Sequence, residues 1–531
     1  MCYNEYIVSP YFHPERNSIM KKALCLRISA LLLSLLMLIS FVGCDILLEE
    51  ITALPTETDM HTLHAETVAA DTPPADSDRP AQNTDSESAS DTLSEIATEM
   101  AGTEDITGIS PKNYDCNFTI LNGNCNVIPS EHIFSEEQDG PVLTATYERA
   151  LRIREHLGVQ LTCNSIDDII GYAQQVIANG QAGVDDYQLV ITHPSVGLTE
   201  LITSDLLYDI AALESVNLNQ PYWATNMMDE IMINGQYLLG YQDLCLMASD
   251  LVVFDKTLLN NYGFASPYEE VLNGSWTLEL CMDMSRAVYQ DNDGDGMPSE
   301  YDIFGTCIWS RESLNSFIPA SDIKIISLDG DDIYSVKDLQ NNEKLFMLVD
   351  RIFELYNCID VTAYDSATGA APKFPNATSL FYFCNTRNLN SFMNREGNFG
   401  ILPYPKFDLD QADYRSRSQN GFLCVPQSIA NPDMVGDVLE LLGYYSSDVK
   451  DAYCAQLLKA YDSEDDARML DIIWKTQVTD MGYILRDRMD QLDEIVSILP
   501  YMCNQGSTST AAYLKFRMSP IQKTLDKILN Y

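Results

Sequence analysis

Short apolar segments alternate with segments of helical periodicity in this chain, beginning near residue 113. Apolar residues at helical spacing predict helices at 146–157 and 166–177, and Gly158 stops the first of them. Runs typical of buried strands occupy 118–121, 159–163 and 187–192. This order of strands and helices is typical of a parallel sheet with crossover helices. The sequence therefore predicts an α/β fold.

Capping signals mark two further helices. Thr277 has the position of an N-cap, with Glu279 in the first turn of the helix. Asn431 stands before Pro432, the order of a cap followed by proline at the first helical position. We find no internal repeat of the length that solenoids and propellers require, so neither architecture is predicted.

The first 44 residues have the features of an export signal. Basic residues between positions 21 and 27 precede a run of 16 apolar and small residues, 28–43, which is short for a bilayer span and typical of a signal-peptide core. Small residues before Cys44 resemble a bacterial lipobox, in which the cysteine is lipidated. We therefore predict a signal peptide with a lipobox at 1–44. An uncleaved membrane anchor stays the alternative.

Met20 directly precedes the basic residues, so we expect translation to start there and residues 1–19 not to be translated. Residues 45–112 carry 16 acidic residues, two basic residues and no Phe, Trp or Tyr. Such a segment buries too little apolar surface to offset its chain entropy. It is predicted to be a disordered acidic tether. Both interpretations of the first 44 residues place the rest of the chain at the extracellular face of the cell membrane.

The charge and the motifs exclude several classes of function. The chain has 78 acidic and 32 basic residues and a net charge of −46, a field that repels phosphate backbones, so we predict no nucleic-acid binding. Residues 113–531 contain three histidines and lack the common zinc-protease, serine-hydrolase and nucleotide-binding motifs. A glycosidase needs only two carboxylates, so an extracellular carbohydrate-active enzyme stays an alternative.

Several phrases, taken in order, resemble the extracellular solute-binding lipoproteins of bacterial ABC importers, the group that includes maltose-binding protein. These phrases are Tyr147-Glu148-Arg149, Asp186 to Val190, Asp205 to Ile210, Val253 to Lys256, Trp276 to Leu278, Phe304-Gly305 and Gly400 to Pro405. Asp205 stands where that group usually has Gly, and Asp255 stands where it has Asn.

The resemblance implies a two-lobed periplasmic-binding-protein-like fold of type II, with the lobes joined by a hinge that the chain crosses several times. It implies that 113–248 form the first part of lobe 1 and that 249–375 form the first part of lobe 2. Residues 376–422 would then return to lobe 1, and 423–531 would complete lobe 2 with C-terminal helices. The ligand would lie between the lobes, at the carboxyl ends of strands.

The sharpest local motif is a loop that fits the first half of a calcium-binding EF-hand. Asp291, Asp293 and Asp295 alternate, the sixth residue is a glycine, Met297 would offer its carbonyl oxygen, and Asp302 takes the last position. Asp302 replaces the usual Glu, and no second helix is predicted after the loop. We therefore expect calcium at a single loop within lobe 2. A solvated acidic turn without metal is the alternative.

The resemblance also indicates ligand-binding residues. It places His193, Asp243, Asn385 and Arg387 on lobe 1 or its crossings and Trp309 on lobe 2. Tyr241 lies close to Asp243, at the first crossing. An aromatic face suits the apolar face of a sugar, and Asp, Asn and Arg offer directional hydrogen bonds to hydroxyl groups. Ordinary packing or a surface ion pair stays open as the alternative for each residue.

These features together predict a lipid-anchored, monomeric, extracellular solute-binding protein that is not an enzyme. It would capture a small ligand, an oligosaccharide, and deliver it to the permease subunits of an ABC transporter. The alternatives are the carbohydrate-active enzyme and a receptor that signals rather than transports.

Overall fold

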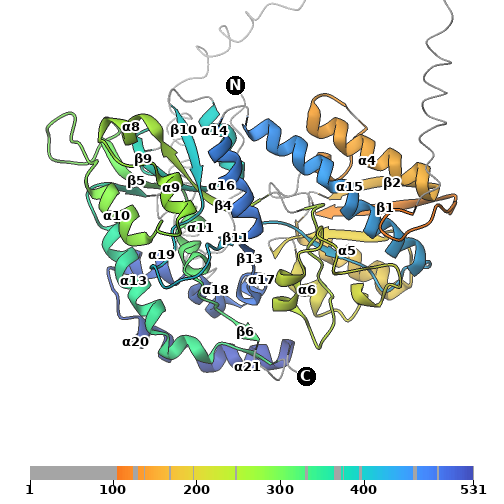
Figure 1. Cartoon of the computed structure of the whole chain (residues 1–531). Coiled ribbons are helices and arrows are strands. Elements are labelled where there is room, and N and C mark those ends of the chain that lie inside the picture. Colours follow the sequence, from red (N-terminus) through yellow and green to blue (C-terminus); the bar gives the residue numbers. More distant parts are fainter. Residues whose placement is uncertain are drawn as a thin grey trace, which may run out of the picture. The chain divides into compact units, whose positions relative to one another are not determined.

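The computed structural model describes residues 105–529 apart from 124–129, 137, 167–168, 195–196, 246–247, 329–332, 364–371, 375, 394–397, 459–462 and 487–488 (Figure 1). The chain divides into two compact units, Met1–Leu93 and Ser94–Tyr531, and the described residues all belong to the second. The predicted signal peptide, the lipidation at Cys44 and most of the predicted tether lie outside the described residues. Within the described part, no helix has the length and apolar character needed to cross a bilayer.

The first sheet has the strand order β12-β3-β1-β2. Its strands are β1 (Cys116–Gly123), β2 (Val159–Ile166), β3 (Leu189–Thr192) and β12 (Phe422–Cys424). β1 pairs in parallel with both β2 and β3, and β12 adds to β3 in the antiparallel direction. The parallel sheet predicted from the alternating pattern is therefore confirmed.

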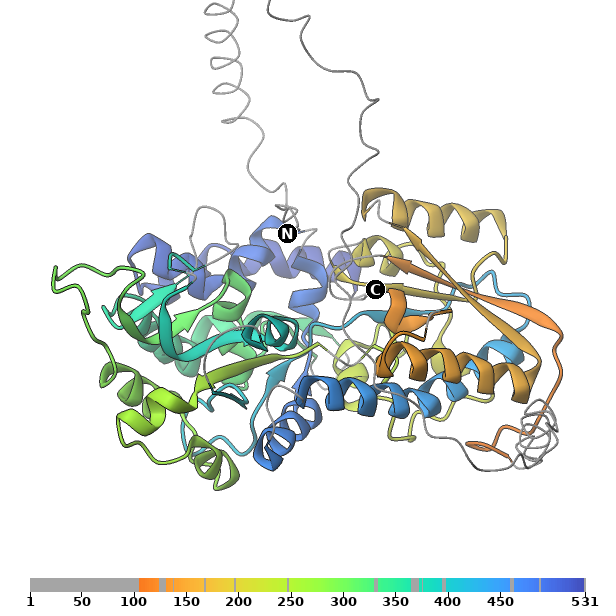
Figure 2. The ribbon, with the colours of Figure 1, turned by 90° about the horizontal axis from the view of Figure 1, so that it is seen from above.

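Three helices accompany this sheet: α4 (Pro141–Leu157), α5 (Ile169–Ala182) and α15 (Pro432–Leu458). α4 ends where predicted, because Gly158 adopts a left-handed conformation with φ of 64°. α15 begins at Pro432 as predicted, and it packs along α4 (Figure 2). Buried Arg149 of α4 donates a 2.8 Å hydrogen bond to Ser446 of α15, which fixes the two helices against each other.

The second sheet has the strand order β10-β4-β9-β5-β8. Its strands are β4 (Asp250–Asp255), β5 (Ile303–Ile308), β8 (Val361–Ala363), β9 (Thr378–Asn385) and β10 (Phe399–Leu402). β5 runs parallel to β8 and β9, whereas β4 is antiparallel to β9 and β10. Every residue of β4 is buried, because the strand lies inside the sheet with partners on both sides.

Three helices of this part of the chain begin at capping side chains. Thr277 is the N-cap of α10 (Leu278–Arg286), as predicted, and its side chain accepts a hydrogen bond from the backbone N–H of Leu280. Asp255 caps α8 (Lys256–Asn261), and Asn342 caps α13 (Glu343–Tyr356). These caps satisfy N–H groups that a helix leaves without intrahelical partners.

The remaining elements are short. The helices are α3 (Ser130–Ile133), α6 (Leu198–Ile202), α7 (Thr225–Met228), α9 (Pro267–Leu272), α11 (Arg311–Asn315), α12 (Phe317–Ala320), α14 (Leu389–Met393), α16 (Glu464–Lys475), α17 (Met481–Leu485), α18 (Asp490–Val496), α19 (Ile498–Gln505), α20 (Thr510–Lys515) and α21 (Met518–Ile528). Single turns of 3-10 helix are η2 (Ile210–Ala212), η3 (Asp229–Ile231), η4 (Lys337–Asn341) and η5 (Thr386–Asn388). Two-stranded ribbons join β6 (Ser327–Leu328) to β7 (Tyr334–Ser335) and β11 (Ser416–Arg417) to β13 (Gln477–Val478).

The assignment of 376–422 to lobe 1 is wrong for most of that segment. β9 and β10 belong to the second sheet, where β9 lies between β4 and β5. Conversely, β12 and α15 accompany the first sheet, although α15 and most of β12 fall in the segment predicted for lobe 2. A buried apolar strand carries no sequence mark of the sheet it joins, which is why the pattern did not distinguish the two.

The predicted tether also extends too far along the chain. Ile106 and Ile109 pair with each other across a turn in which Thr107 and Gly108 have positive φ. Ile109 is buried, and its carbonyl oxygen lies 2.9 Å from the Nε2 atom of His156 in α4. Residues 105–112 are therefore part of the folded unit.

Segments that connect the two sheets lie side by side. The chain passes from the first sheet to the second before β4, and it returns between β10 and β12. Ser249 of the first passage bridges Ser418 of the second, and the N–H of Gln419 donates to Ala248 at 3.0 Å. β13 then pairs in parallel with β11. These paired segments form the hinge with several crossings that the resemblance implies.

A buried carboxylate holds the edge of the second sheet. Asp466, in the first turn of α16, is inaccessible to solvent and accepts a 2.8 Å hydrogen bond from the N–H of Ile401 in β10. It also forms a 2.9 Å ion pair with Lys256 and accepts a hydrogen bond from Tyr268. One side chain therefore ties α16 to a strand and to two helices.

We expect Asp466→Ala to lower the free energy of unfolding by about 3–5 kcal/mol, because it leaves a charge and an N–H group without their buried partner. The matched control is Asp465→Ala, which removes an exposed carboxylate one residue earlier and should cost about 0.5 kcal/mol or less. Urea denaturation followed by circular dichroism measures both. Equal losses in the two variants would contradict this role of Asp466.

Candidate ligand-binding site

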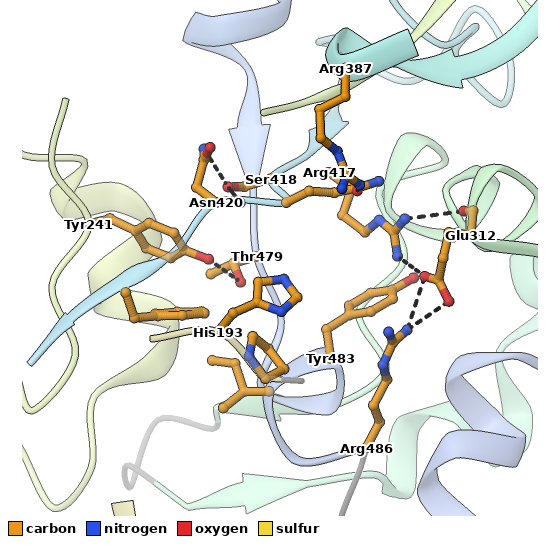
Figure 3. Close-up of a pocket in the computed structure, with 14 residues that line it drawn as sticks. His193, Tyr241, Glu312, Arg387, Arg417, Ser418, Asn420, Thr479, Tyr483 and Arg486 are labelled. Atoms are coloured by element: carbon orange, nitrogen blue, oxygen red, sulfur yellow. Dashed lines mark hydrogen bonds and ion pairs between the residues drawn. The ribbon is translucent and has the colours of Figure 1, made fainter. Parts of the chain in front are cut away.

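A cavity of about 150 Å³ lies beside the connecting segments (Figure 3). It is lined by His193, Pro194, Tyr241, Glu312, Arg387, Arg417, Ser418, Gln419, Asn420, Phe422, Thr479, Tyr483, Ile484 and Arg486. Pockets for drug-sized ligands measure roughly 300–1,000 Å³, so this cavity has room for one sugar ring rather than for a whole oligosaccharide.

Strand ends of both sheets supply residues of the cavity. His193 directly follows β3 of the first sheet, and Arg387 lies in the turn that follows β9 of the second. Glu312 belongs to the first turn of α11, which begins shortly after β5. Ligand sites in α/β sheets collect at the carboxyl ends of strands, and these positions follow that rule.

Glu312 is the carboxylate at the centre of the charged wall. It accepts hydrogen bonds from Arg417 at 2.8 Å and from Arg486 at 3.0 Å. Burial alone would raise the pKa of Glu312, but the guanidinium groups of Arg486 and Arg417 hold that pKa well below its usual value. Glu312 is therefore ionised at neutral pH.

Arg417 joins Glu312 to a second carboxylate, Asp250. The Nε atom of Arg417 donates to Asp250 at 2.7 Å, and both side chains are almost wholly buried. Ser316 and Gln419 also donate to Asp250. Burial lowers the pKa of Arg417, but the two carboxylates outweigh that effect and raise the pKa well above its ordinary value. The guanidinium stays charged, and its Nε, Nη1 and Nη2 atoms each donate to an acceptor on Asp250 or Glu312.

His193 has its imidazole in the lining of the cavity. Burial is the largest cause that lowers the pKa of His193 to about 3, followed by the positive charges of Arg486 and Arg387. The imidazole is therefore neutral at neutral pH, with one nitrogen that donates and one that accepts. Such a ring suits a hydroxyl group, which also donates and accepts.

Aromatic side chains form the apolar part of the lining. The rings of Tyr241 and Phe422 lie 4.6 Å apart, and the hydroxyl group of Tyr241 lies 3.2 Å from that of Thr479. The ring of Tyr483 lies against the guanidinium of Arg417, 4.9 Å from ring centre to guanidinium carbon. The cavity therefore combines aromatic faces with charged and neutral polar groups.

Three of the six ligand residues predicted from the sequence line this cavity: His193, Tyr241 and Arg387. Arg387 comes from the second sheet, so its predicted place on lobe 1 is wrong, for the same reason that β9 was misassigned. Asn385 is misplaced in the same way. Its side chain caps η5 and accepts from the N–H of Arg387 at 3.1 Å, so it positions that arginine.

The other two predicted residues lie elsewhere. Asp243 forms a 3.2 Å ion pair with Lys450 of α15. The ring of Trp309 packs against Phe392, with ring centres 5.8 Å apart, and the backbone N–H of Trp309 donates to the carbonyl oxygen of Phe383. Neither side chain lines the cavity, and ligand roles for Asp243, Trp309 and Asn385 stay predictions.

The sequence did not reveal Glu312, Arg417, Arg486 or Tyr483. One signal was available: Ser310 is followed three residues later by Ser313, and Ser310 caps α11, which fixes the helix that carries Glu312. Nothing in the sequence pairs Arg417 with Asp250, because the two are 167 residues apart.

The predicted calcium loop brings three carboxylates together. Asp291, Asp293 and Asp302 each offer an oxygen atom, and these atoms lie within 4.8 Å of one another. Asp291 accepts from the N–H groups of Gly294 and Gly296, both of which have positive φ. Hard oxygen ligands at this spacing fit a cation such as Ca²⁺.

Asp295 and Met297, the other two predicted calcium ligands, are not part of that group. Asp295 accepts a 2.6 Å hydrogen bond from the N–H of Met297, whose side chain is exposed. Asp302 is buried and directly precedes β5, so a strand and not a second helix follows the loop, as predicted.

Comparison with known proteins yields matches to solved structures. No family model matches the chain, and no curated protein matches it. One match is the sugar-binding protein MalE from the phytopathogen Xanthomonas citri, with a TM-score of 0.54 and 13% identity over 77% of this chain and 98% of that one. The fold is that of a MalE-like, type II solute-binding protein.

Two further structures share this solute-binding fold. The galacto-N-biose-/lacto-N-biose I-binding protein of the ABC transporter from Bifidobacterium longum, in complex with lacto-N-biose, matches with a TM-score of 0.53 and 12% identity. That match covers 78% of this chain and 97% of the other. A cyclo/maltodextrin-binding protein complexed with maltotetraose has a TM-score of 0.51 and 12% identity, over 78% and 98% of the two chains. The fold class predicted from the resemblance is confirmed.

We expect calcium to raise the thermal midpoint of the protein and a chelator to lower it, because bound cation would offset the repulsion among the three carboxylates. Asp291→Asn should abolish this response. The matched control is Glu300→Gln, which removes an exposed charge from the same loop and should keep the response. Differential scanning calorimetry with and without calcium measures the shift. A wild-type midpoint that is the same in calcium and in chelator would contradict the calcium prediction.

Proposed function

We infer that the protein captures an oligosaccharide in the described cavity and holds one sugar residue there. The observation that carries this inference is that strand ends of both sheets converge on one polar and aromatic cavity. The solved structures with this fold include proteins bound to lacto-N-biose and to maltotetraose, which supports a sugar as the ligand here.

The side chains in the lining suit a sugar. The rings of Tyr241 and Phe422 would contact the apolar side of a pyranose, whereas His193 and Gln419 would offer donors and acceptors to its hydroxyl groups. A site that hydrogen-bonds hydroxyl groups rejects analogues that lack them, because buried polar groups would be left unmatched.

Capture is coupled to movement about the connecting segments. His193 and Arg387 come from different sheets, and a ligand that contacts both gains contacts that a more open arrangement lacks. A ligand shifts a conformational equilibrium only by its differential affinity for the two states. Residues 416–420 run between the sheets and line the cavity, so they would respond directly to the ligand.

The charges in the cavity favour binding over hydrolysis. Among the described residues in the lining, Glu312 is the one carboxylate. Its ion pairs with Arg417 and Arg486 hold its pKa low, so it carries no proton to donate to a glycosidic oxygen at neutral pH. A glycosidase of the usual kind needs a protonated carboxyl group and a second carboxylate facing the same bond.

We further propose that the protein acts as a monomer at the extracellular face of the cell membrane, anchored by a lipid on Cys44. It would deliver its ligand to the permease subunits of an ABC transporter, and the calcium loop would stabilise the part of the protein built on the second sheet. The export signal and the lipobox-like residues before Cys44 support the anchor. A receptor that signals rather than transports would need the same fold. Loss of solute uptake on deletion of the gene would separate transport from signalling.

We expect a glycan from a mixed oligosaccharide panel to bind the purified protein and to be recovered chemically intact. A ligand at about 100 times its Kd should stabilise the protein by about 2.7 kcal/mol. Equilibrium dialysis followed by chromatography and mass spectrometry of the glycans measures both depletion and integrity. Appearance of shorter products would instead establish the carbohydrate-active enzyme.

We expect Cys44→Ala to leave the precursor uncut or to release the protein from the membrane, because the lipidated thiol would be missing. Cys25→Ala is the matched control, since Cys25 lies in the same predicted signal peptide and should leave anchoring unchanged. Membrane fractionation and mass spectrometry of the mature N-terminus report the outcome. An unmodified mature N-terminus at another residue in the wild type would contradict the prediction.

A further inference from the structure

The lining of the cavity has an excess of positive charge. Arg387, Arg417 and Arg486 all belong to it, and Glu312 is the one carboxylate among the described lining residues. Asp250 lies behind Arg417 and adds a second negative charge to the cluster. Among the described residues of this cluster, three guanidinium groups stand against two carboxylates, in a chain whose net charge is −46.

The two carboxylates are engaged with two of the three arginines. Both oxygens of Glu312 accept from Arg486, and one of them also accepts from Arg417. Asp250 accepts from Arg417 through one oxygen and from Gln419 through the other. These contacts fix Arg417 and Arg486 in place and use most of the acceptor sites of the two carboxylates.

Arg387 enters the cavity from the side opposite to Arg486 (Figure 3). Its Nη2 atom donates to the side-chain oxygen of Gln419 at 2.7 Å, which is a neutral acceptor, and the residue itself is exposed. The capping box of Asn385 and Asn388 holds the turn that carries it. Arg387 is therefore a positioned cation that faces the space where a ligand would lie.

The pKa of His193 depends on the same charged groups. After burial, the charges of Arg486, Arg387 and Arg417 lower its pKa, and the opposing effect of Glu312 is smaller than the sum. The field at the imidazole is therefore positive, and the imidazole itself adds no charge to it. An uncharged ligand gains less from such a field than an anionic group does, because the field stabilises a negative charge directly.

We propose that the captured glycan carries a carboxylate, as in a uronic acid residue, and that Arg387 binds this carboxylate beside Arg417 and Arg486. This proposal rests on the proposed function and names the substrate class of the same cavity. A planar guanidinium matches a carboxylate with two parallel hydrogen bonds, which a hydroxyl group does not reproduce. The acidic surface of the protein would repel such a ligand at long range, so its recognition depends on contacts within the cavity.

The test uses pairs of trisaccharides that differ mainly in charge: trigalacturonate with galactotriose, cellotriuronate with cellotriose, and a mannuronate trimer with mannotriose. Titration calorimetry on the full-length protein should find a uronate that binds at least about tenfold more tightly than its neutral partner, the size expected for a charge-assisted hydrogen bond. Raising the salt concentration should weaken binding of the uronate and leave binding of the neutral sugar unchanged.

Arg387→Gln should remove most of this preference by weakening the uronate at least about tenfold more than its neutral partner, because it deletes the charge and keeps a polar side chain. The matched control is Arg468→Gln, which removes the same charge from the exposed face of α16 and should keep the preference. Neutral trisaccharides that bind as tightly as the uronates would overturn this proposal and leave the proposed function standing. A preference that survives Arg387→Gln would also overturn it. Binding by no member of the panel would contradict both.

Discussion

Arg417 is held between Asp250 of β4 and Glu312 of α11, and the shape of the cavity depends on these two contacts. The arginine lies in a segment that connects the two sheets, and its guanidinium is 5% exposed. Loss of one partner from a buried pair typically costs about 3–5 kcal/mol, since the other charge is left behind. The network therefore fixes one geometry for the connecting segment and presents Ser418, Gln419 and Asn420 to the cavity.

The charge around the cavity differs in sign from the net charge of the chain. Acidic residues outnumber basic ones by more than two to one, yet three arginines meet at the cavity. The surface charge keeps the protein soluble and repels polyanions at long range, whereas the contacts within the cavity decide what is held. Ion pairs with Glu312 and Asp250 orient Arg417 and Arg486, whereas Arg387 donates to the neutral side chain of Gln419.

Local signals in the sequence predicted individual helices and strands better than they predicted which strands and side chains pair with one another. The caps at Thr277 and at Asn431 before Pro432, and the parallel pairing of the strands that alternate with helices in the first sheet, follow from local patterns and were predicted correctly. Membership of β9 in the second sheet depends on pairing with β4, more than a hundred residues earlier, and was predicted wrongly. Half of the predicted ligand residues line the cavity, because strand ends can be located from sequence but the ion pairs of Arg417 cannot.

Hydrogen–deuterium exchange of the full-length protein, with and without a bound glycan, tests the location of the ligand site most directly. The proposed site predicts slower exchange in peptides that cover 416–422 and 481–486, since these segments line the cavity and connect to both sheets. Peptides from α10 and α13, which contribute no residue to the lining, should exchange as before. Protection confined to another part of the described chain, with 416–422 unchanged, would contradict the assignment of this cavity as the ligand site.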